Sequence, residues 1–576
     1  MTEEKNIPAK ISDEIKNKGI IAFLAEHSLK PNEPGFDNFL NSVSKAIVQT
    51  NSSLFDNRDA QTLAQIPQTA FFRLQHKFII LIPKLECNHL ELINLVSVLV
   101  KKGGDDMAAN QPNAALRTWF EKHPKRALEV YQDAQKGNQL AKEHLTFALE
   151  GTMDIEAAVD FATQNDISLR REAVSALARI QGSDTQSALA LETLVTLALD
   201  NSDEQITLSA LIGGFEILSR HPEMSRTSME EALKARITVQ TPNTINACAQ
   251  LLSRQYKNLT SWERELCLET VRAVQPDHLG TISLINRAAF QCVEGDELVE
   301  LGTTIGEIID GSEGGIRFSQ FDDFFYQLND LGPEVFGKIA VRWLLEGGPA
   351  VRAQLAGRIS EIGQEGPIFK VDKTLLPKTS EEQLFLCKKS IGFLFLAPMT
   401  ASEIPLCVLK YGDPKIVREV LELIFNPLVL SYGGAMRRHL KNVSEGGHPK
   451  ADQLLMLLKR KDRIHDDAKD AHKLIEFRPS EAHRQIERVR WNEEIQRSQK
   501  QPENRSILRD FCTVQHLLYG KRSASYIPEA GGELRKFEMT MHTHSVEAEL
   551  PLLNVLDPVG LEMALYQMKS EELVKT

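Results

Sequence analysis

Two histidines and a glutamate in the C-terminal part of the chain have a spacing that suits metal binding. His542 and His544 are two residues apart, and Glu538 lies four residues before His542. Residues two apart on a strand share one face, so both imidazoles would point toward the same ion. No third ligand is identifiable, and paired solvent-facing histidines are common without a metal. We therefore predict neither a metal site nor a cofactor here.

A second polar group lies on a predicted helix and consists of His465, Asp466, Asp467, Asp470 and His472. His465 and His472 are two helical turns apart on a similar face. Ala468, one turn after His465, cannot ligate a metal. We interpret the group as the polar surface of a helix.

The motifs of common enzyme classes are missing. Gly520-Lys521-Arg522-Ser523 resembles the end of a phosphate-binding loop, but Gln515 stands where that loop needs its first glycine and Arg522 where it needs a hydroxyl. The sequence also has no GxGxxG after a strand, no HExxH and no GxSxG. We predict no catalytic residue, and an enzyme whose site is assembled from distant helices is the weakest interpretation.

Basic residues gather after residue 436. The segment from Arg437 to Arg509 has 18 Lys and Arg against 12 Asp and Glu, although the whole chain carries a net charge of −12. The candidate nucleic-acid-binding residues are Arg437, Arg438, Lys441, Lys459, Arg460, Lys461 and Arg463. Such a cluster would neutralise phosphates and release counterions. The alternatives are a solvated helix with charges paired at i to i+4 and a surface for an acidic protein.

Aromatic residues concentrate between residues 317 and 328. Phe321, Phe324 and Tyr326 are candidate contacts to a partner protein, because aromatic side chains dominate binding surfaces. The alternative is a buried helix stripe made of Phe318, Phe321, Phe325 and Leu328. Their helical spacing favours this second interpretation.

The elements that must position these residues are helices. Asp166 is a helix-capping residue, and apolar side chains follow at Leu169, Ala173, Leu177 and Ile180. This spacing predicts a short amphipathic helix whose small buried residues let another helix pack closely against it.

The same start signal recurs along the chain. Asp166, Asp203, Asn243 and Asp277 are separated by 37, 40 and 34 residues, which is the range of two-helix solenoid units. Capping boxes, in which a hydroxyl and a glutamate each satisfy one backbone donor, are predicted to start other helices. These boxes are Thr227–Glu230, Thr260–Glu263 and Thr379–Glu382.

One segment resembles the second helix of the HEAT/armadillo class of α-solenoids, and it is echoed twice. The three segments are Leu169–Leu177, Gly348–Leu355 and Asp413–Leu421, each with an Arg inside a Leu/Val ladder. The resemblance covers about residues 110–430. It implies a stack of helix pairs with a concave binding surface, and it implies no catalytic residues.

The expected fold class is all-α, an α-solenoid of stacked helix pairs with a small α+β C-terminal segment. At 576 residues the chain is too long for one compact core, and an array avoids that limit. The predicted parts are an N-terminal helical cap over 1–110, repeats over 111–430, a basic helical segment over 431–510 and an α+β cap over 511–576. Alternating apolar and polar residues predict a strand within 534–550.

The most consistent function is a protein-interaction or scaffold role, with another protein as the partner. A nucleic-acid-binding solenoid that uses residues 437–509, in genome maintenance or defence, is the second interpretation. The seven cysteines are scattered singly, the N-terminus lacks a secretory signal, and the apolar runs are too short to span a membrane. These features predict a cytoplasmic protein without membrane contact.

Overall fold

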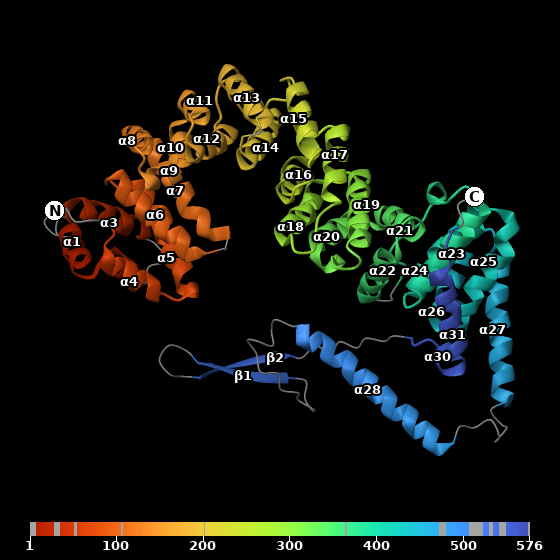
Figure 1. Ribbon diagram of the computed structural model, residues 1–576. Helices are drawn as coiled ribbons and strands as arrows, with labels where there is room; N and C mark the ends of the chain where they lie inside the picture. Colours follow the sequence, from red (N-terminus) through yellow and green to blue (C-terminus); the bar gives the residue numbers. More distant parts are fainter. Residues whose placement is uncertain are drawn as a thin grey trace. The chain divides into compact units, whose positions relative to one another are not determined.

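The computed structural model describes residues 7–27, 35–50, 54–104, 107–200, 202–362, 366–471, 480–505, 522–528, 534–540 and 549–573. These residues are predominantly helical, and the chain divides into two compact units, Met1–Asp330 (unit 1) and Leu331–Thr576 (unit 2). The division falls inside the region 111–430 that the sequence predicts as one array. Figure 1 labels the helices and strands of both units.

Unit 1 is built from short helices joined by tight turns. Its α-helices are α1 Ile7–Lys18, α2 Ile20–Glu26, α3 Phe36–Thr50, α4 Asn57–Gln65, α5 Gln68–Leu81, α6 His89–Gly103, α7 Gln111–Lys122, α8 Pro124–Gln135, α9 Gln139–Glu143, α10 Leu145–Thr152, α11 Ile155–Thr163, α12 Ile167–Arg179, α13 Asp184–Leu199, α14 Glu204–Arg220, α15 Thr227–Ile237, α16 Pro242–Gln255, α17 Ser261–Val271, α18 Leu279–Ala288, α19 Gly295–Gly311 and α20 Asp322–Leu331. Its 3₁₀ turns are η1 Ile82–Lys84, η2 Met107–Asn110, η3 Tyr256–Asn258, η4 Ala289–Gln291 and η5 Phe318–Gln320.

The helices of unit 1 stack in two rows, which confirms the predicted helical repeat. In one row α10, α12, α14, α16 and α18 each pack against the next, and in the other α11 packs against α13 and α13 against α15. Members of the two rows also pair, as α11 does with α12 and α13 with α14 (Figure 1). Each pair therefore buries one apolar face against its partner and another against the neighbouring pair.

Polar contacts link residues about one repeat apart. Arg171 Nη2 lies 3.0 Å from Asp203 Oδ2, and the two residues are 32 positions apart in sequence. Arg254 Nη1 lies 3.0 Å from Glu216 Oε1, 38 residues earlier. These separations are close to the spacing of the helix-start signals, so contacts recur at about one repeat.

The start signals are only partly correct in detail. Asp166 and Asp203 cap α12 and α14 as predicted, since their side chains accept backbone N–H groups of the first turn. α16 starts earlier than expected and is capped by Thr241. Thr227 is the first residue of α15 and forms no capping box, because the preceding Arg226 occupies the cap position.

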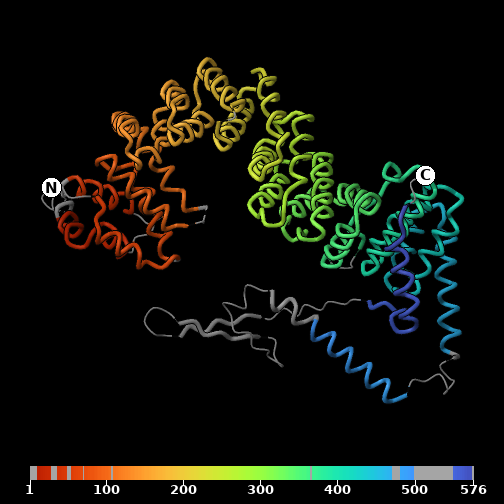
Figure 2. Tube along the Cα trace, viewed as in Figure 1, coloured from red at the N-terminus to blue at the C-terminus, as the bar shows by residue number. Residues whose placement is uncertain are grey.

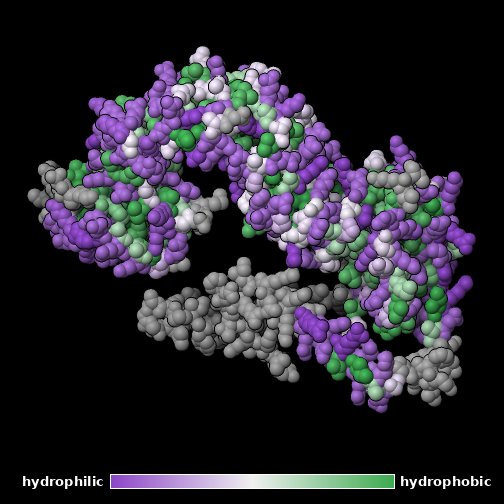
Figure 3. Space-filling view, viewed as in Figure 1, coloured by the Kyte–Doolittle hydropathy of each residue, from purple (hydrophilic) through white to green (hydrophobic). Residues whose placement is uncertain are grey.

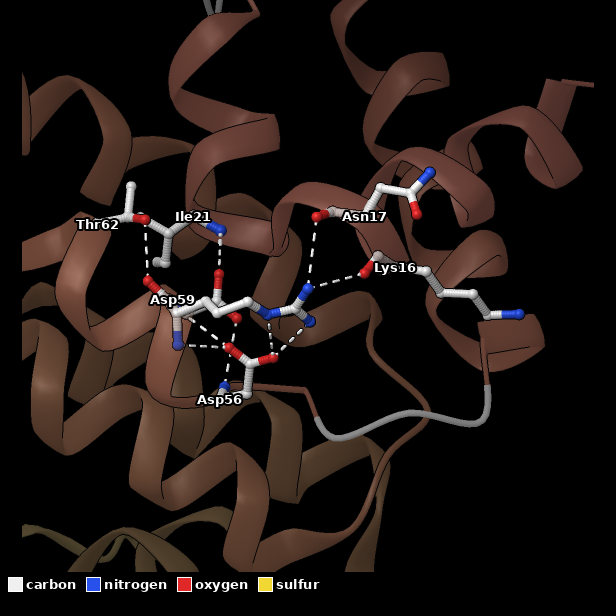
Figure 4. A network of polar contacts seen from close by, with 7 residues as sticks. Lys16, Asn17, Ile21, Asp56, Asp59 and Thr62 are labelled. Carbon is white, nitrogen blue, oxygen red and sulfur yellow. Dashed lines mark hydrogen bonds and ion pairs between the residues drawn. The ribbon is translucent and has the colours of Figure 1, made fainter.

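A polar network ties the first helices of unit 1 together (Figure 4). Asp56 caps α4, while the Asp59 carboxylate accepts the backbone N–H of Ile21, at the start of α2, over 2.9 Å. Arg58 Nη1 donates to the carbonyl of Lys16 over 3.2 Å. Burial raises the pKa of Asp59. The first turn of α4 thus contributes hydrogen bonds to the backbone of two other helices, α1 and α2.

Unit 2 is also built mainly from helices. Its elements are α21 Pro333–Leu345, α22 Pro349–Ile362, η6 Lys373–Leu375, α23 Ser380–Leu394, α24 Pro398–Tyr411, η7 Pro414–Ile416, α25 Val417–Leu423, the π-helical turn η8 Ile424–Val429, α26 Gly433–Glu445, α27 Ala451–Ala471, α28 Glu481–Arg505, β1 Arg522–Pro528, β2 Leu534–Thr540, α30 Leu553–Leu556 and α31 Pro558–Ser570. The capping box Thr379–Glu382 starts α23 as predicted. α26 and α27 pack against each other, and α31 packs against α23.

The C-terminal part differs from the expected α+β cap. β1 and β2 form an antiparallel two-stranded ribbon, with Arg522 opposite Thr540 and Pro528 opposite Leu534. The helix that follows, α31, packs on α23 and so belongs to the helical part of unit 2 (Figure 2). The physical reason is that a two-stranded ribbon offers too little apolar surface to hold a helix, whereas α23 offers a helical face.

Candidate interaction surfaces

The predicted basic residues lie on α26 and α27, and some of them are neutralised within unit 2. Arg437 forms an ion pair with Asp462, which lowers the pKa of that carboxyl. Arg460 Nη1 lies 2.7 Å from Glu422 Oε1, and its guanidinium also covers the ring of Phe425, 3.9 Å from the ring centroid. These two arginines are therefore held by neighbouring helices.

Four of the predicted cations remain open to solvent. Arg438 and Lys441 on α26 and Lys459 and Arg463 on α27 are exposed. Within the described parts of the chain, no ion pair joins these four side chains to an acidic residue. The basic surface is thus smaller than the sequence suggests, with Lys461 half-buried beside Gly433.

The aromatic candidates divide between core and surface. Phe321 and Phe324 are fully buried in unit 1, as are Phe325 and Leu328. The buried stripe is therefore correct, and Phe321 and Phe324 are not available to a partner. Periodicity had already favoured burial, because Phe321, Phe325 and Leu328 share one helix face.

Tyr326 is the exception, with 67% of its surface exposed. It stands beside Phe290, which is 48% exposed, at a ring-centroid distance of 6.3 Å. The two rings come from α20 and η4. This small aromatic pair is the part of the predicted partner surface that the fold leaves accessible.

A larger apolar surface lies on α30 and α31, where the sequence analysis placed no site. Its exposed side chains are Leu552, Val555, Leu556, Val559, Met563 and Tyr566. Val559, Met563 and Tyr566 follow one another at spacings of four and three residues and so form one stripe on α31. We call these three residues the outer stripe. Figure 3 shows hydrophobic side chains gathered at the lower right, over α30 and α31.

A signal in the sequence could have revealed this surface. Leu561 faces α23 and is buried, while the outer stripe lies on the opposite side of the same helix. α31 therefore has apolar residues on two opposite faces, and each apolar face of a helix is normally covered by another element. The apolar residues between 550 and 568 therefore predict a second buried surface on this segment.

The other residues that the sequence analysis considered as possible ligands do not come together in one place among the described residues. His465, Asp466 and Asp467 are exposed on α27, as expected for a polar helix surface. The described residues exclude His472, His542, His544, Gly520 and Lys521, so these positions remain predictions. Glu538 and Arg522 lie on the strands of the ribbon.

One set of metal-type ligands comes together that the sequence did not reveal. His221 Nδ1 lies 3.4 Å from Glu223 Oε1 and 3.7 Å from Asp184 Oδ1, and all three ligand atoms lie within 4.8 Å of one another. Both carboxylates are exposed. Water satisfies exposed carboxylates without a metal, so this arrangement alone does not define a metal site.

A half-buried acid and a buried base lie close together between α24 and α26. Glu403 Oε1 lies 3.5 Å from His439 Nε2. Burial raises the pKa of Glu403 to about 7 and lowers the pKa of His439 to about 4. Both groups are therefore uncharged between about pH 4 and pH 7, so they contribute to the pH dependence of the stability of unit 2.

Comparison with known proteins identifies no family for this chain. No family model matches the chain, and no curated protein matches it. Among solved structures, an engineered protein has 12% identity, with 80% of this chain and 98% of that chain covered and a TM-score of 0.20. A circular tandem repeat protein with a novel repeat topology has 11% identity, with 81% and 99% covered and a TM-score of 0.16. At such TM-scores neither likeness carries an argument, so the HEAT/armadillo class stays a prediction.

In the part of the chain that the structure describes, no helix is both long enough and apolar enough to span a lipid bilayer.

Proposed function

We propose that this helical-repeat protein binds another protein through the outer stripe of α31. The observation that carries the proposal is the exposure of Val559, Met563 and Tyr566, at 66%, 59% and 71%. Burying each such side chain in an interface is worth about 1.5–3 kcal/mol. Three adjacent residues therefore form a typical binding centre, surrounded by the further apolar side chains of α30.

The charges around the stripe indicate the kind of partner. Among the described residues of 549–573, Asp557, Glu562 and Glu572 are exposed, against one exposed cation, Lys569. An acidic rim favours a partner with Lys or Arg at the edge of its own apolar surface. The expected partner is thus a protein that presents an apolar patch or amphipathic helix with basic flanks.

The test is recovery of a stoichiometric partner from native lysate on the tagged full chain. The variant Val559→Ser/Met563→Ser/Tyr566→Ser should lose that partner, because its binding centre becomes polar. The matched control is Leu128→Ser/Leu189→Ser/Leu199→Ser, which removes three exposed leucines of unit 1. This control should keep the partner. Retention by the outer-stripe variant, or no partner from several growth states, would contradict the proposal.

Nucleic-acid binding by α26 and α27 is the second candidate. It is favoured by the four exposed cations Arg438, Lys441, Lys459 and Arg463, which are available to phosphates. Four phosphate contacts predict that log K falls with log salt at a slope of roughly −3 to −4. A protein interface centred on apolar residues depends much less on salt.

Binding of labelled DNA and RNA across a salt series separates the two candidates. Reversal of all four charges to Glu should abolish binding, whereas reversal of four exposed lysines of unit 1, at 101, 125, 234 and 257, should not. A flat salt dependence or equal loss in both variants would remove this candidate.

A further inference from the structure

The C-terminal segment, residues 549–573, docks on unit 2 as a ligand would. Residues 472–548 separate it in sequence from α27, which is the end of the stacked helices. α31 lies against α23, and together with α22 these helices border a cavity of about 370 Å³. Mainly apolar side chains line this cavity, including Ile359, Phe393 and Leu565.

The two helices approach closely at a glycine. A Cβ added to Gly392 on α23 would lie 2.9 Å from Met568 Cβ on α31. Any larger residue at position 392 would push α31 away. Gly392 therefore creates the space in which the docked helix lies.

A buried lysine recognises the end of the docked helix. Lys389 is 1% exposed, and its Nζ donates to the carbonyl of Lys569 over 2.6 Å and also to the carbonyl of Glu571. Lys388 Nζ lies 2.8 Å from Glu571 Oε1. A cation at the C-terminus of a helix satisfies its free carbonyls and complements its dipole.

The start of the segment is recognised by a helix N-terminus. The Glu549 carboxylate accepts the backbone N–H groups of Gly434 and Ala435, in the first turn of α26, over 2.7 and 2.6 Å. The N–H of Leu552 donates to the carbonyl of Ser431 over 2.9 Å. Both ends of the segment are thus held by charges that match the local helix dipoles.

We propose that the surface of α23, Ser431 and α26 that holds this segment, which we call the segment groove, is a helix-binding site, and that the equivalent segment 549–573 of a second copy can occupy it. The anchors described above join the segment to α23, Ser431 and α26. The same bonds form whichever copy supplies the segment. The 472–548 connection contains α28, whose 25 residues alone span roughly 37 Å at a rise of about 1.5 Å per residue, so a long connection joins the segment to α27.

The covalent connection determines whether the chain's own segment or the segment of a second copy occupies the site. A tethered segment has a high effective concentration, so the chain's own segment fills the segment groove in dilute solution. A second copy's segment takes its place when the tethered one is defective. The inner contacts use Leu561 and Met568, so the inference does not depend on the outer stripe or on the proposed function.

Two full-length variants test this exchange by complementation. The segment variant Leu561→Asp/Met568→Asp cannot dock its own helix but keeps an intact segment groove. The groove variant Lys389→Glu/Gly392→Leu keeps an intact segment. Each alone should be monomeric by light scattering, and an equimolar mixture should form a 1:1 heterodimer. A mixture that stays monomeric while both variants retain wild-type circular dichroism overturns the proposal.

A peptide assay keeps the test independent of dimer formation. A fluorescent synthetic peptide of residues 549–573 should bind the segment variant saturably and the wild-type chain at least about tenfold more weakly, because the tethered segment competes. Adding Lys389→Glu to the segment variant should weaken binding about 10- to 100-fold, since charge-assisted bonds are lost. Adding the exposed control Lys415→Glu should change nothing. Equal binding to wild type and segment variant would contradict occupation of the segment groove by the chain's own segment.

Discussion

Arg226 binds the carboxylate of Glu263 through two hydrogen bonds, Nη2 to Oε2 over 2.6 Å and Nε to Oε1 over 3.0 Å. The two residues are 37 apart in sequence, and the Glu263 side chain is 0% exposed. The same carboxylate accepts the N–H of Thr260, so it also completes the capping box of α17. One buried group therefore joins a local helix start to the contact between successive repeats.

Removal of this carboxylate should destabilise unit 1 strongly. Glu263→Ala leaves the Arg226 guanidinium without its partner and breaks a capping box, so we expect a loss of about 3–5 kcal/mol. The control is Glu216→Ala, which removes a more exposed pair with Arg254 and should cost at most about 1 kcal/mol. Urea unfolding of both variants, followed by circular dichroism, measures the difference. Equal losses would refute the special role of the buried pair.

Unit 2 should gain stability at alkaline pH when Glu403 is neutralised. Because the pKa of Glu403 is raised to about 7 in the folded chain from an ordinary value of 4.5, its stabilising contribution is present below pH 4.5 and is lost as the pH rises through 7. Glu403→Gln should therefore be more stable than wild type at pH 8 by about 1–3 kcal/mol and show little gain at pH 4.5.

Unfolding at both pH values measures this difference. His439, whose pKa is lowered to about 4, has the opposite sign, since its contribution is lost as the pH falls through 4. The exposed control Glu419→Gln should change stability by similar amounts at pH 4.5 and pH 8. A gain for Glu403→Gln that is the same at both pH values would show that burial of the charge is not its cause.

Gly19 should tolerate no side chain. Its φ is +85°, and an added Cβ would lie 2.4 Å from Asp59 Oδ1, which accepts the N–H of Ile21. Gly35 has a similar φ of +96° with no atom within 4 Å of the added Cβ. Both Ala substitutions should cost about 1–2 kcal/mol of stability through backbone strain. The stability loss at Gly19 should exceed that at Gly35 by at least about 1 kcal/mol, and this difference measures the clash with Asp59. Thermal unfolding that shifts equally for both would rule the clash out.

Replacing Phe324 by Ala should destabilise unit 1 far more than replacing Tyr326, although the two residues are only two positions apart. Phe324→Ala removes a fully buried ring and should cost about 3–5 kcal/mol of stability. Tyr326→Ala changes an exposed side chain and should stay within about 0.5 kcal/mol of wild type. Denaturant unfolding of the two variants provides the comparison, and a large loss at Tyr326 would mean that its ring is buried in solution.

Local patterns in the sequence were sufficient to predict the helical repeat. Asp166 and Asp203 cap helices as expected, and the spacing of the start signals matches the contacts between successive repeats. Helix caps and apolar stripes depend on residues within one or two turns, so a single sequence carries them. The burial of Phe321 and Phe325 followed from that same periodicity.

The surfaces were decided by tertiary structure. Nothing near Arg460 in sequence indicates that Glu422 neutralises it, and nothing near Lys389 indicates that it binds carbonyls of Lys569 and Glu571. Such pairs join residues tens to hundreds of positions apart, and the packing of helices selects them. The exposure of Met563 has the same origin: the sequence determined that α31 has two apolar faces, but only its docking on α23 decided which face is exposed to solvent.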